Sequence, residues 1–206
     1  EHRDATPEQR EIREINSSIY VFDAAVLRHG LGNLDRDNSQ GEVYLTDVLA
    51  IARSQGGSVR ALRTDDPFLV EGVNDRVQLA VLGAEMNRRI LADWMASGVT
   101  VIDPATTWVD VDVELERDVT ILPGTQLYGA TVVREGATVG PDTTLTSTEV
   151  GQHATVSRTQ AELAVIGDNA SVGPFSYLRP GTVLGSGGKI GGFVETKNAK
   201  IGAGAK

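Results

Sequence analysis

The sequence has no cysteine among its 206 residues, and only 5% of them are aromatic. Without cysteine the chain can form neither a disulfide framework nor a zinc–thiolate site, and it has no thiol for nucleophilic catalysis. Its three histidines, His2, His29 and His153, are scattered along the chain, which is poor evidence for a zinc site built from histidine. Disulfide scaffolds, thiol enzymes and zinc hydratases are therefore disfavoured.

Basic residues and long apolar runs are also scarce. The 19 Lys and Arg residues are outnumbered by 28 Asp and Glu residues, so the formal net charge is −9, which disfavours a nucleic-acid-binding surface. No run of about 18 apolar residues could span a bilayer, and no signal peptide opens the chain. We therefore expect a cytoplasmic protein. Because the chain starts at Glu1 and stops at Lys206 within a repeat, we expect it to be an internal piece of a longer protein.

Aliphatic residues recur at every sixth position through most of residues 115–206. The lead positions are Leu115, Ile121, Leu127, Val133, Val139 and Leu145, then, after two irregular steps, Ile166, Val172, Leu178, Leu184 and Ile190. The fifth position of most hexads is small: Thr125, Thr131, Ala137, Thr143, Ala154, Ala170, Ser176 and Thr182. A period of six fits neither a helix nor an alternating strand, but it fits a parallel β-helix with three short strands in each coil.

The residue sizes follow from the narrow interior of such a coil. One branched aliphatic side chain fills the interior of each face, and the small residue lets the chain turn the corner. The corners also carry glycine and proline, at Pro123-Gly124, Gly140-Pro141, Gly173-Pro174 and Pro180-Gly181. The pattern therefore predicts a parallel β-helix over residues 108–206.

Residues 1–74 have a different pattern, in which short apolar runs alternate with amphipathic segments. Residues 15–22 and 58–63 predict strands, Asp23 is a suitable N-cap for a helix ending at Leu31, and residues 42–53 predict a second helix. Strands that alternate with helices favour a mostly parallel sheet. We therefore expect residues 1–74 to be the closing part of an α/β domain.

Residues 75–107 predict a connecting helix and a linker. The helix covers residues 75–97, Asn74 stands where an N-cap is expected, and Gly98 is a plausible end. The apolar stripe of this helix consists of Leu79, Leu82, Met86 and Ile90.

Six segments carry a family resemblance, and they occur in the order EHRDATPEQREIREINSSIYVFD, SQGEVYLTD, EGVNDRVQLA, GVTVIDPATTW, GPFSYLRPGT and GGFVETKNAKIGAGAK. In this order they resemble the bacterial bifunctional N-acetylglucosamine-1-phosphate uridylyltransferase / glucosamine-1-phosphate N-acetyltransferase family over the whole chain. Two positions depart from the family's pattern. Ser18 stands where the family usually has glycine, which would strain the backbone if φ is positive there, and Asp75 replaces the usual asparagine.

The resemblance implies the C-terminal part of a Rossmann-like nucleotidyltransferase domain in residues 1–74, a long connecting helix, and a left-handed parallel β-helix that forms a homotrimer. It implies acetyl transfer from acetyl-CoA to glucosamine 1-phosphate, then Mg²⁺-dependent uridylyl transfer from UTP to N-acetylglucosamine 1-phosphate. The product, UDP-N-acetylglucosamine, serves peptidoglycan and cell wall synthesis. The family's nucleotide loop lies upstream and its acetyl-transfer base lies beyond Lys206, so we expect no catalytic residue in this segment and no turnover by it alone.

The resemblance also implies binding residues in the first domain. Glu1 and Asn16 match residues that hydrogen-bond the sugar ring, which needs both acceptors and donors. Asn74 matches a magnesium ligand, and an amide oxygen suits that hard ion. By themselves, the residues favour a solvated acid for Glu1 and a turn-forming asparagine for Asn16. Asn74 could be a helix N-cap and a magnesium ligand at once.

Arg179 and Lys197 match residues that hold the substrate phosphate for acetyl transfer. Each is the second residue of its hexad, and they lie 18 residues apart, which is one full coil. We therefore expect two cations on neighbouring strands, about 4.8 Å apart between backbones. Such a pair either binds an anion or splays apart in solvent. The same spacing places Glu116 beside Arg134.

Two other functions fit the pattern. A single-function sugar-phosphate nucleotidyltransferase could use the β-helix only to oligomerise. Alternatively, the β-helix could be a non-enzymatic assembly module, which would not need Arg179 and Lys197 stacked.

Overall fold

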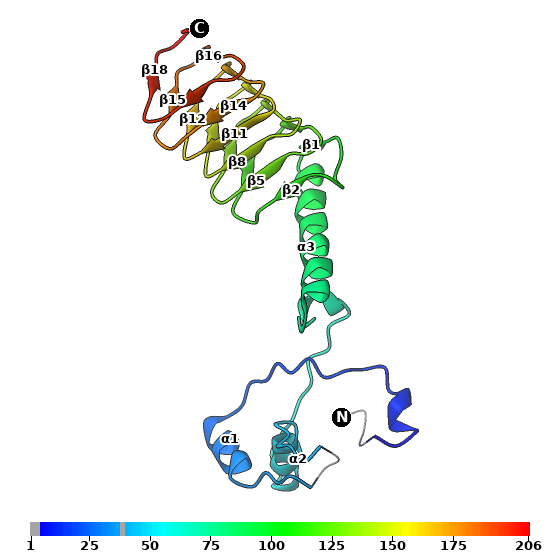
Figure 1. Cartoon of the computed structure of the whole chain (residues 1–206). Helices are drawn as coiled ribbons and strands as arrows, with labels where there is room; N and C mark the ends of the chain where they lie inside the picture. The colour runs from blue at the N-terminus through cyan, green and yellow to red at the C-terminus, as the bar shows by residue number, and fades with distance from the viewer. Residues whose placement is uncertain (1–4, 38–39) are drawn as a thin grey trace. The chain divides into compact units, whose positions relative to one another are not determined.

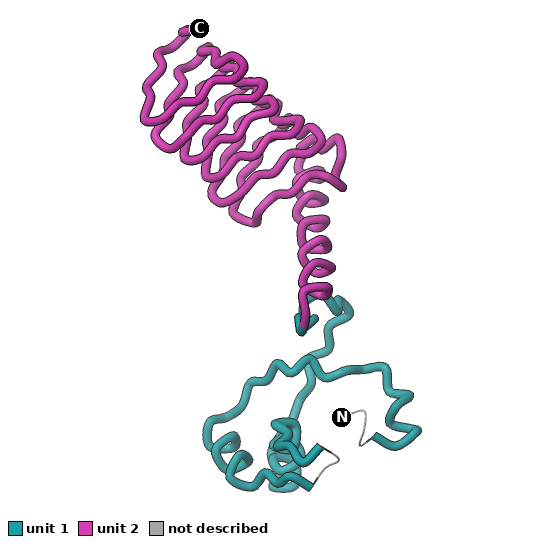
Figure 2. The backbone as a smooth tube through the Cα atoms, viewed as in Figure 1, with its two compact units in different colours: residues 1–74 teal, residues 75–206 magenta. Residues whose placement is uncertain are grey.

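The hexad lead residues point inward and form a continuous core. The coils around this core stack into a parallel β-solenoid (Figure 1). Each predicted lead residue is at most 6% exposed, and each predicted small residue at the fifth position is at most 5% exposed. The computed structural model describes residues 5–37 and 40–206 and divides into two compact units, residues 1–74 and residues 75–206 (Figure 2). The solenoid predicted from the repeat is therefore confirmed.

Three parallel sheets, A, B and C, form the walls of the solenoid, and every coil adds one strand to each. Sheet A contains β1 (Thr100–Val101), β4 (Thr120–Ile121), β7 (Thr138–Val139), β10 (Thr155–Val156), β13 (Ser171–Val172) and β16 (Lys189–Ile190). Sheet B contains β2 (Trp108–Val109), β5 (Gln126–Tyr128), β8 (Thr144–Thr146), β11 (Thr159–Glu162), β14 (Ser176–Leu178) and β17 (Glu195–Thr196). Sheet C contains β3 (Glu114–Leu115), β6 (Val132–Val133), β9 (Glu149–Val150), β12 (Val165–Ile166), β15 (Val183–Leu184) and β18 (Lys200–Ile201). The first strand, β1, lies inside the segment that the sequence assigns to the linker.

The corners between sheets explain the irregular steps in the repeat. A six-residue step accommodates a glycine of positive φ, such as Gly124 at +72° or Gly181 at +80°. The steps from 145 to 150, 156 to 161 and 161 to 166 have one residue fewer, and their corners carry Ser147, Arg158 and Leu163 at φ of 44° to 46°. The shortening occurs at the corner and not in the strands, so the inward-facing positions of successive coils stay in register.

Helix α3 (Arg76–Ala96) precedes the first coil and packs on it through its C-terminal half. Its N-cap is Asp75, whose side chain accepts a hydrogen bond from the Gln78 backbone N–H, so the prediction of Asn74 as the cap is wrong. Aspartate is as good an N-cap residue as asparagine, so the helix can begin directly after Asp75. The packed face contains Asn87, Leu91 and Trp94, whereas most of the predicted stripe is not buried.

Asn87 attaches α3 to the solenoid. Its Nδ2 donates to the Thr107 carbonyl at 2.8 Å, and its Oδ1 accepts from the Val109 N–H at 3.0 Å, both in buried surroundings. We expect Asn87→Ala to lower the free energy of unfolding by about 2–4 kcal/mol, because two buried backbone groups lose their partners. Urea denaturation would measure this change. Arg88→Ala, on the exposed side of the same turn, should change stability by less than about 1 kcal/mol, and equal losses in both variants would contradict the role of Asn87.

Unit 1 contains short helices and extended segments. Its elements are the 3-10 turns η1 (Gln9–Glu11) and η2 (Pro67–Leu69) and the helices α1 (Ala24–Leu31) and α2 (Asp47–Ser54). The Asp23 cap is confirmed, since its carboxylate accepts from the N–H groups of Ala25 and Val26. The predicted start of the second helix is five residues too early.

The strands predicted at residues 15–22 and 58–63 are wrong, because neither segment is in a strand. A strand needs a neighbour for its backbone donors and acceptors, and no described residue of unit 1 belongs to a sheet. Their apolar side chains are accordingly exposed, Val21 by 99% and Leu62 fully. The core of this unit is limited to the contact of α1 with α2 around Val48.

Candidate functional site

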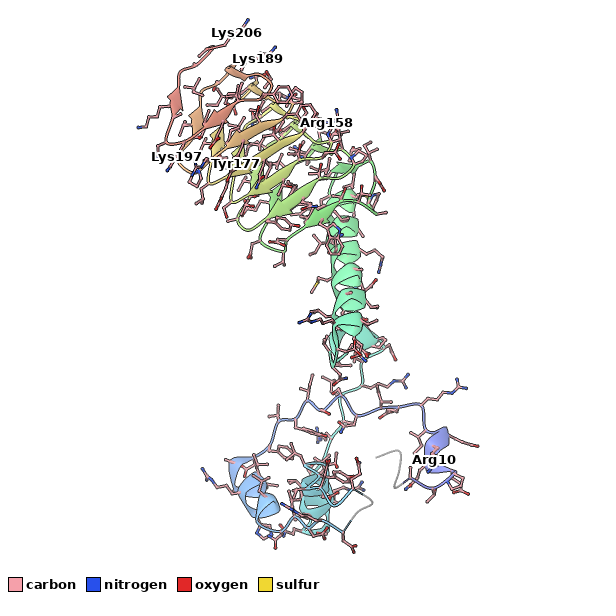
Figure 3. The ribbon with its side chains drawn as sticks, viewed as in Figure 1. Arg10, Arg158, Tyr177, Lys189, Lys197 and Lys206 are labelled. Atoms are coloured by element: carbon pink, nitrogen blue, oxygen red, sulfur yellow. The ribbon has the colours of Figure 1, made fainter. Side chains whose placement is uncertain are left out.

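Arg179 and Lys197 lie side by side at the ends of neighbouring strands of sheet B. Leu178 of β14 pairs with Thr196 of β17, so the residues that follow are also adjacent, as the repeat predicted. A carboxylate also accompanies the two cations, because Arg179 Nη1 donates to Glu195 Oε1 at 3.0 Å. Glu195 therefore compensates one cation and fixes the guanidinium, while the exposed Lys197 projects on the same side as Tyr177 (Figure 3).

A depression of about 560 Å³ lies on sheet B beside these residues. Tyr177 and Glu195 are register partners on its floor, and Phe175 and Phe193 line one side. Arg179 does not line the depression itself but is hydrogen-bonded to Glu195, which does. The end of sheet B thus combines two cations, a carboxylate and aromatic surface, which suits an anionic group on a larger polar ligand.

The predicted sugar- and metal-binding residues belong to unit 1 or lie outside the described residues, as Glu1 does. Asn16 is exposed, its Oδ1 accepts from the Ser18 N–H at 3.1 Å, and its Nδ2 donates to the Tyr20 hydroxyl. This is the geometry of a turn-forming asparagine. Ser18 has a φ of 61°, so the left-handed backbone that the sequence associated with glycine is present. Asn74 is exposed and directly precedes the cap of α3.

An ion-pair network on sheet C confirms the predicted pairing of Glu116 with Arg134. Arg134 Nη1 donates to Glu116 Oε1 at 3.0 Å, and its Nη2 donates to Glu149 Oε1 at 3.1 Å. The Glu135 backbone N–H donates to Glu116 at 2.8 Å. This backbone hydrogen bond, followed by that from Arg134, lowers the pKa of Glu116, and the two carboxylates raise the pKa of Arg134.

The lowered pKa of Glu116 predicts how the stability of the folded protein changes at acidic pH. The folded carboxyl holds its proton less tightly than the unfolded one, whose pKa is 4.5. Its contribution to stability is therefore full above the unfolded pKa and is lost as pH falls through the lower folded pKa. We expect Glu116→Gln to be less stable than the unmodified chain at pH 6, with the gap narrowing below pH 4.5. Thermal midpoints followed by circular dichroism across this range would measure it. Glu114→Gln, at an exposed position of the same sheet, is the control, and a constant gap at every pH would contradict the prediction.

Side chains of the kinds that bind metals do not cluster within the described residues. Over residues 5–37 and 40–206 there is no group of three or more His, Asp or Glu side chains placed to hold a metal ion. His153 is exposed at a corner of the solenoid, where its φ is 55°. Of the helices in the described parts of the chain, none combines the length and apolar character that crossing a bilayer requires.

Sequence reasoning missed Glu195 and the two phenylalanines. The repeat contained a signal for Glu195, because it lies 18 residues after Tyr177 and must therefore neighbour it on the next coil. Phe175 and Phe193 stack with ring centroids 5.3 Å apart. Their sequence separation is also 18 residues, although a corner residue has no fixed direction in the hexad pattern.

Comparison with known proteins finds a family model that matches part of the chain and relatives that match all of it. The family "Bacterial transferase hexapeptide (six repeats)" matches residues 163–198. The chain is 63% identical over all 206 residues to "Bifunctional protein GlmU" of Pseudarthrobacter chlorophenolicus, covering 42% of that protein. It is 60% identical over its whole length to the protein of the same name from Mycolicibacterium vanbaalenii, again covering 42%. The chain thus spans less than half the length of these relatives.

Among solved structures, the chain resembles a mutant perosamine N-acetyltransferase from Caulobacter crescentus in complex with CoA and GDP-perosamine. The TM-score is 0.36 at 20% identity, over 71% of this chain and 85% of that one. At this TM-score and identity, the ligands of that structure support no inference about the ligands of this chain.

Proposed function

We propose, starting from the whole-length match of this chain to a segment of the bifunctional GlmU proteins, that the intact protein makes UDP-N-acetylglucosamine in two steps. It transfers acetyl from acetyl-CoA to glucosamine 1-phosphate, then uridylyl from UTP to N-acetylglucosamine 1-phosphate. The protein is a cytoplasmic homotrimer. Unit 1 completes a Rossmann-like nucleotidyltransferase domain, and the solenoid is left-handed and belongs to the acetyltransferase domain.

The observation that carries this proposal is the identity of about 60% across both units. A protein that used only the solenoid fold would be expected to match over the repeats alone. Here the match extends through residues 1–74, where no hexapeptide repeat exists. A bifunctional enzyme accounts for similarity in both units.

In the acetyl-transfer step, Arg179 and Lys197 bind the phosphate of glucosamine 1-phosphate. Glu195 holds the guanidinium of Arg179 through Nη1, which leaves further N–H groups to donate to phosphate oxygens. The ammonium of Lys197 adds a second charge from the neighbouring strand. Charge-assisted contacts from two fixed strands orient the sugar for attack on acetyl-CoA. The proton-accepting base would come from outside residues 1–206.

In the uridylyl-transfer step, Glu1 and Asn16 bind the sugar ring and Asn74 contributes an oxygen ligand to Mg²⁺. When bound, the ion would neutralise charge on the reacting phosphates. Asn74 offers a single amide oxygen, and the described residues contain no cluster that would complete a site. The described residues therefore do not complete a magnesium site by themselves, and the remaining ligands would come from outside them.

Two assays on the intact protein test the proposal. The first follows acetyl transfer from acetyl-CoA to glucosamine 1-phosphate, and the second follows pyrophosphate release from UTP and N-acetylglucosamine 1-phosphate with Mg²⁺. We expect both activities. Pyrophosphate release without acetyl transfer would support the single-function nucleotidyltransferase instead, and the absence of both would support an assembly module.

A further inference from the structure

Arg179 has a charged neighbour on each adjacent coil of sheet B. The strands β11 and β17 lie on either side of β14 in this sheet. Their register with β14 places Glu162 on one side of Arg179 and Lys197 on the other. We call Glu162, Arg179 and Lys197 the charged row. Neighbouring strands are about 4.8 Å apart, so a carboxylate lies one strand away from the proposed phosphate-binding cations.

The solenoid itself does not use the carboxylate of Glu162. This side chain is exposed, and within the described part of the chain it accepts no hydrogen bond and forms no ion pair. Its register partner on the preceding coil is Thr146, so this position of the repeat does not require a charge. Glu195, by contrast, is bound by Arg179 Nη1 at 3.0 Å. Glu162 therefore presents an uncompensated negative charge beside the cations.

The four charged side chains at this end of sheet B sum to zero, because Glu162 and Glu195 balance Arg179 and Lys197. Surface that has no net charge does not concentrate anions by long-range attraction. It must bind them through short, directed contacts, which the two cations can donate to one phosphate. A second phosphate on the same ligand would have to share these two cations, and it would raise the negative charge that faces Glu162.

The charge of the ligand decides how strongly Glu162 opposes binding, because Coulomb repulsion grows in proportion to that charge. A phosphate monoester carries about 1.5 to 2 negative charges at pH 7, and pyrophosphate and nucleoside triphosphates carry more. Under the proposed function, the intact protein consumes UTP and releases pyrophosphate. Polyphosphates are therefore present wherever the protein acetylates glucosamine 1-phosphate, and a carboxylate beside the cations weakens their binding more than that of the substrate.

We propose that Glu162 is a specificity-determining residue of the acetyl-transfer site, which selects a sugar monophosphate over pyrophosphate and other polyphosphates by charge. This inference rests on the proposed function and specifies how its phosphate site chooses among anions. The two carboxylates then have different tasks. Glu195 holds the guanidinium of Arg179, whereas Glu162 opposes ligands of higher charge.

Inhibition of acetyl transfer by pyrophosphate, in the intact protein without added Mg²⁺, tests this role. In Glu162→Gln we expect the inhibition constant of pyrophosphate to fall about tenfold and the KM for glucosamine 1-phosphate to fall by no more than about fourfold, because the repulsion removed is larger for the more highly charged anion. Glu162→Asp keeps the charge and should behave as the unmodified protein does. The control Glu114→Gln removes one exposed negative charge from sheet C and should change neither constant.

Three results would overturn the role of Glu162. Unchanged constants in Glu162→Gln, with or without a lowered thermal midpoint, would mark a structural or merely solvated carboxylate. Equal decreases for both anions would indicate simple competition between Glu162 and the ligand for Arg179. Equal effects in Glu114→Gln would indicate that the net charge of the protein is responsible.

Calorimetric titration with pyrophosphate gives a second measurement, which does not depend on acetyl transfer. Binding should be about tenfold tighter in Glu162→Gln than in the unmodified protein, and this gain should be lost in Glu162→Gln/Lys197→Ala. Pyrophosphate bound elsewhere on the intact protein is common to all three proteins and cancels in the comparison. No gain, or a gain that persists without Lys197, would overturn the proposal. Absence of acetyl transfer in the unmodified protein would instead contradict the proposed function, while the titration would still test selection by charge at the charged row.

Discussion

Leu127→Asp should unfold the solenoid. Leu127 is fully buried on β5, between Val109 and Leu145 of the neighbouring coils. Losing a buried leucine costs about 2–5 kcal/mol, and a carboxylate in the narrow core has no room for a partner or for water, which adds several kcal/mol. The sum is of the order of the whole stability of a domain. We expect the β-sheet signal in circular dichroism to be lost at 25 °C and the protein to become sensitive to protease.

The control for this variant lies one residue earlier on the same strand. Gln126→Glu adds the same charge at an outward position, and its side chain can still accept from the Tyr128 hydroxyl. We expect a change within about 0.5 kcal/mol. A folded Leu127→Asp protein with a normal thermal midpoint would contradict the inward register. A severe loss from Gln126→Glu would show that charge alone destabilises this sheet.

Under the proposed function, substitutions in the two units should separate the two activities of the intact protein. Asn74→Ala removes a proposed oxygen ligand of magnesium and should lower uridylyl transfer while leaving acetyl transfer nearly unchanged. Arg179→Ala and Lys197→Ala should do the reverse. Each removes a charge-assisted contact, so kcat/KM for acetyl transfer should fall about ten- to a hundredfold or more. Separate kinetic assays of the two reactions would measure these changes.

Arg134→Ala is the matched control for Arg179→Ala. Both arginines are bound by carboxylates on the outer surface of the solenoid, but Arg134 lies on sheet C. We expect it to affect stability and not acetyl transfer. If Arg179 and Lys197 bind one phosphate, their double variant should also be non-additive in a double-mutant cycle. Unchanged acetyl-transfer kinetics in both single variants, with lowered thermal midpoints, would mark the two residues as structural.

Much of the solenoid and part of the candidate site could be predicted because, in a regular repeat, the separation of two residues in the sequence gives their relative position in space. A residue 18 positions further along occupies the same place on the next coil, so the spacing of Arg179 and Lys197, and of Glu116 and Arg134, gives neighbours directly. The same rule fails where a step has five residues, as between Val156 and Ile166. There the corner geometry at positive φ decides the register.

The sequence was a weaker guide to unit 1 and to α3. The apolar run at residues 15–22 has the composition of a strand, but strand formation depends on a partner that supplies hydrogen bonds, and no described residue of unit 1 does so. In α3 the apolar periodicity selected a stripe through Leu79 and Met86. The face that packs on the first coil is instead determined by the buried hydrogen bonds of Asn87, a polar residue to which periodicity gives no weight.

By itself, then, the sequence determined which side chains of the solenoid point inward and which residues stack from coil to coil. Both follow from a fixed period combined with a core too narrow for more than one branched side chain per face. Only the tertiary structure decided that Glu195 neutralises Arg179 and that Phe175 stacks on Phe193. Outward side chains and corner residues are free to rotate toward any neighbour, so their partners depend on distances and charges that exist only once the coils are stacked.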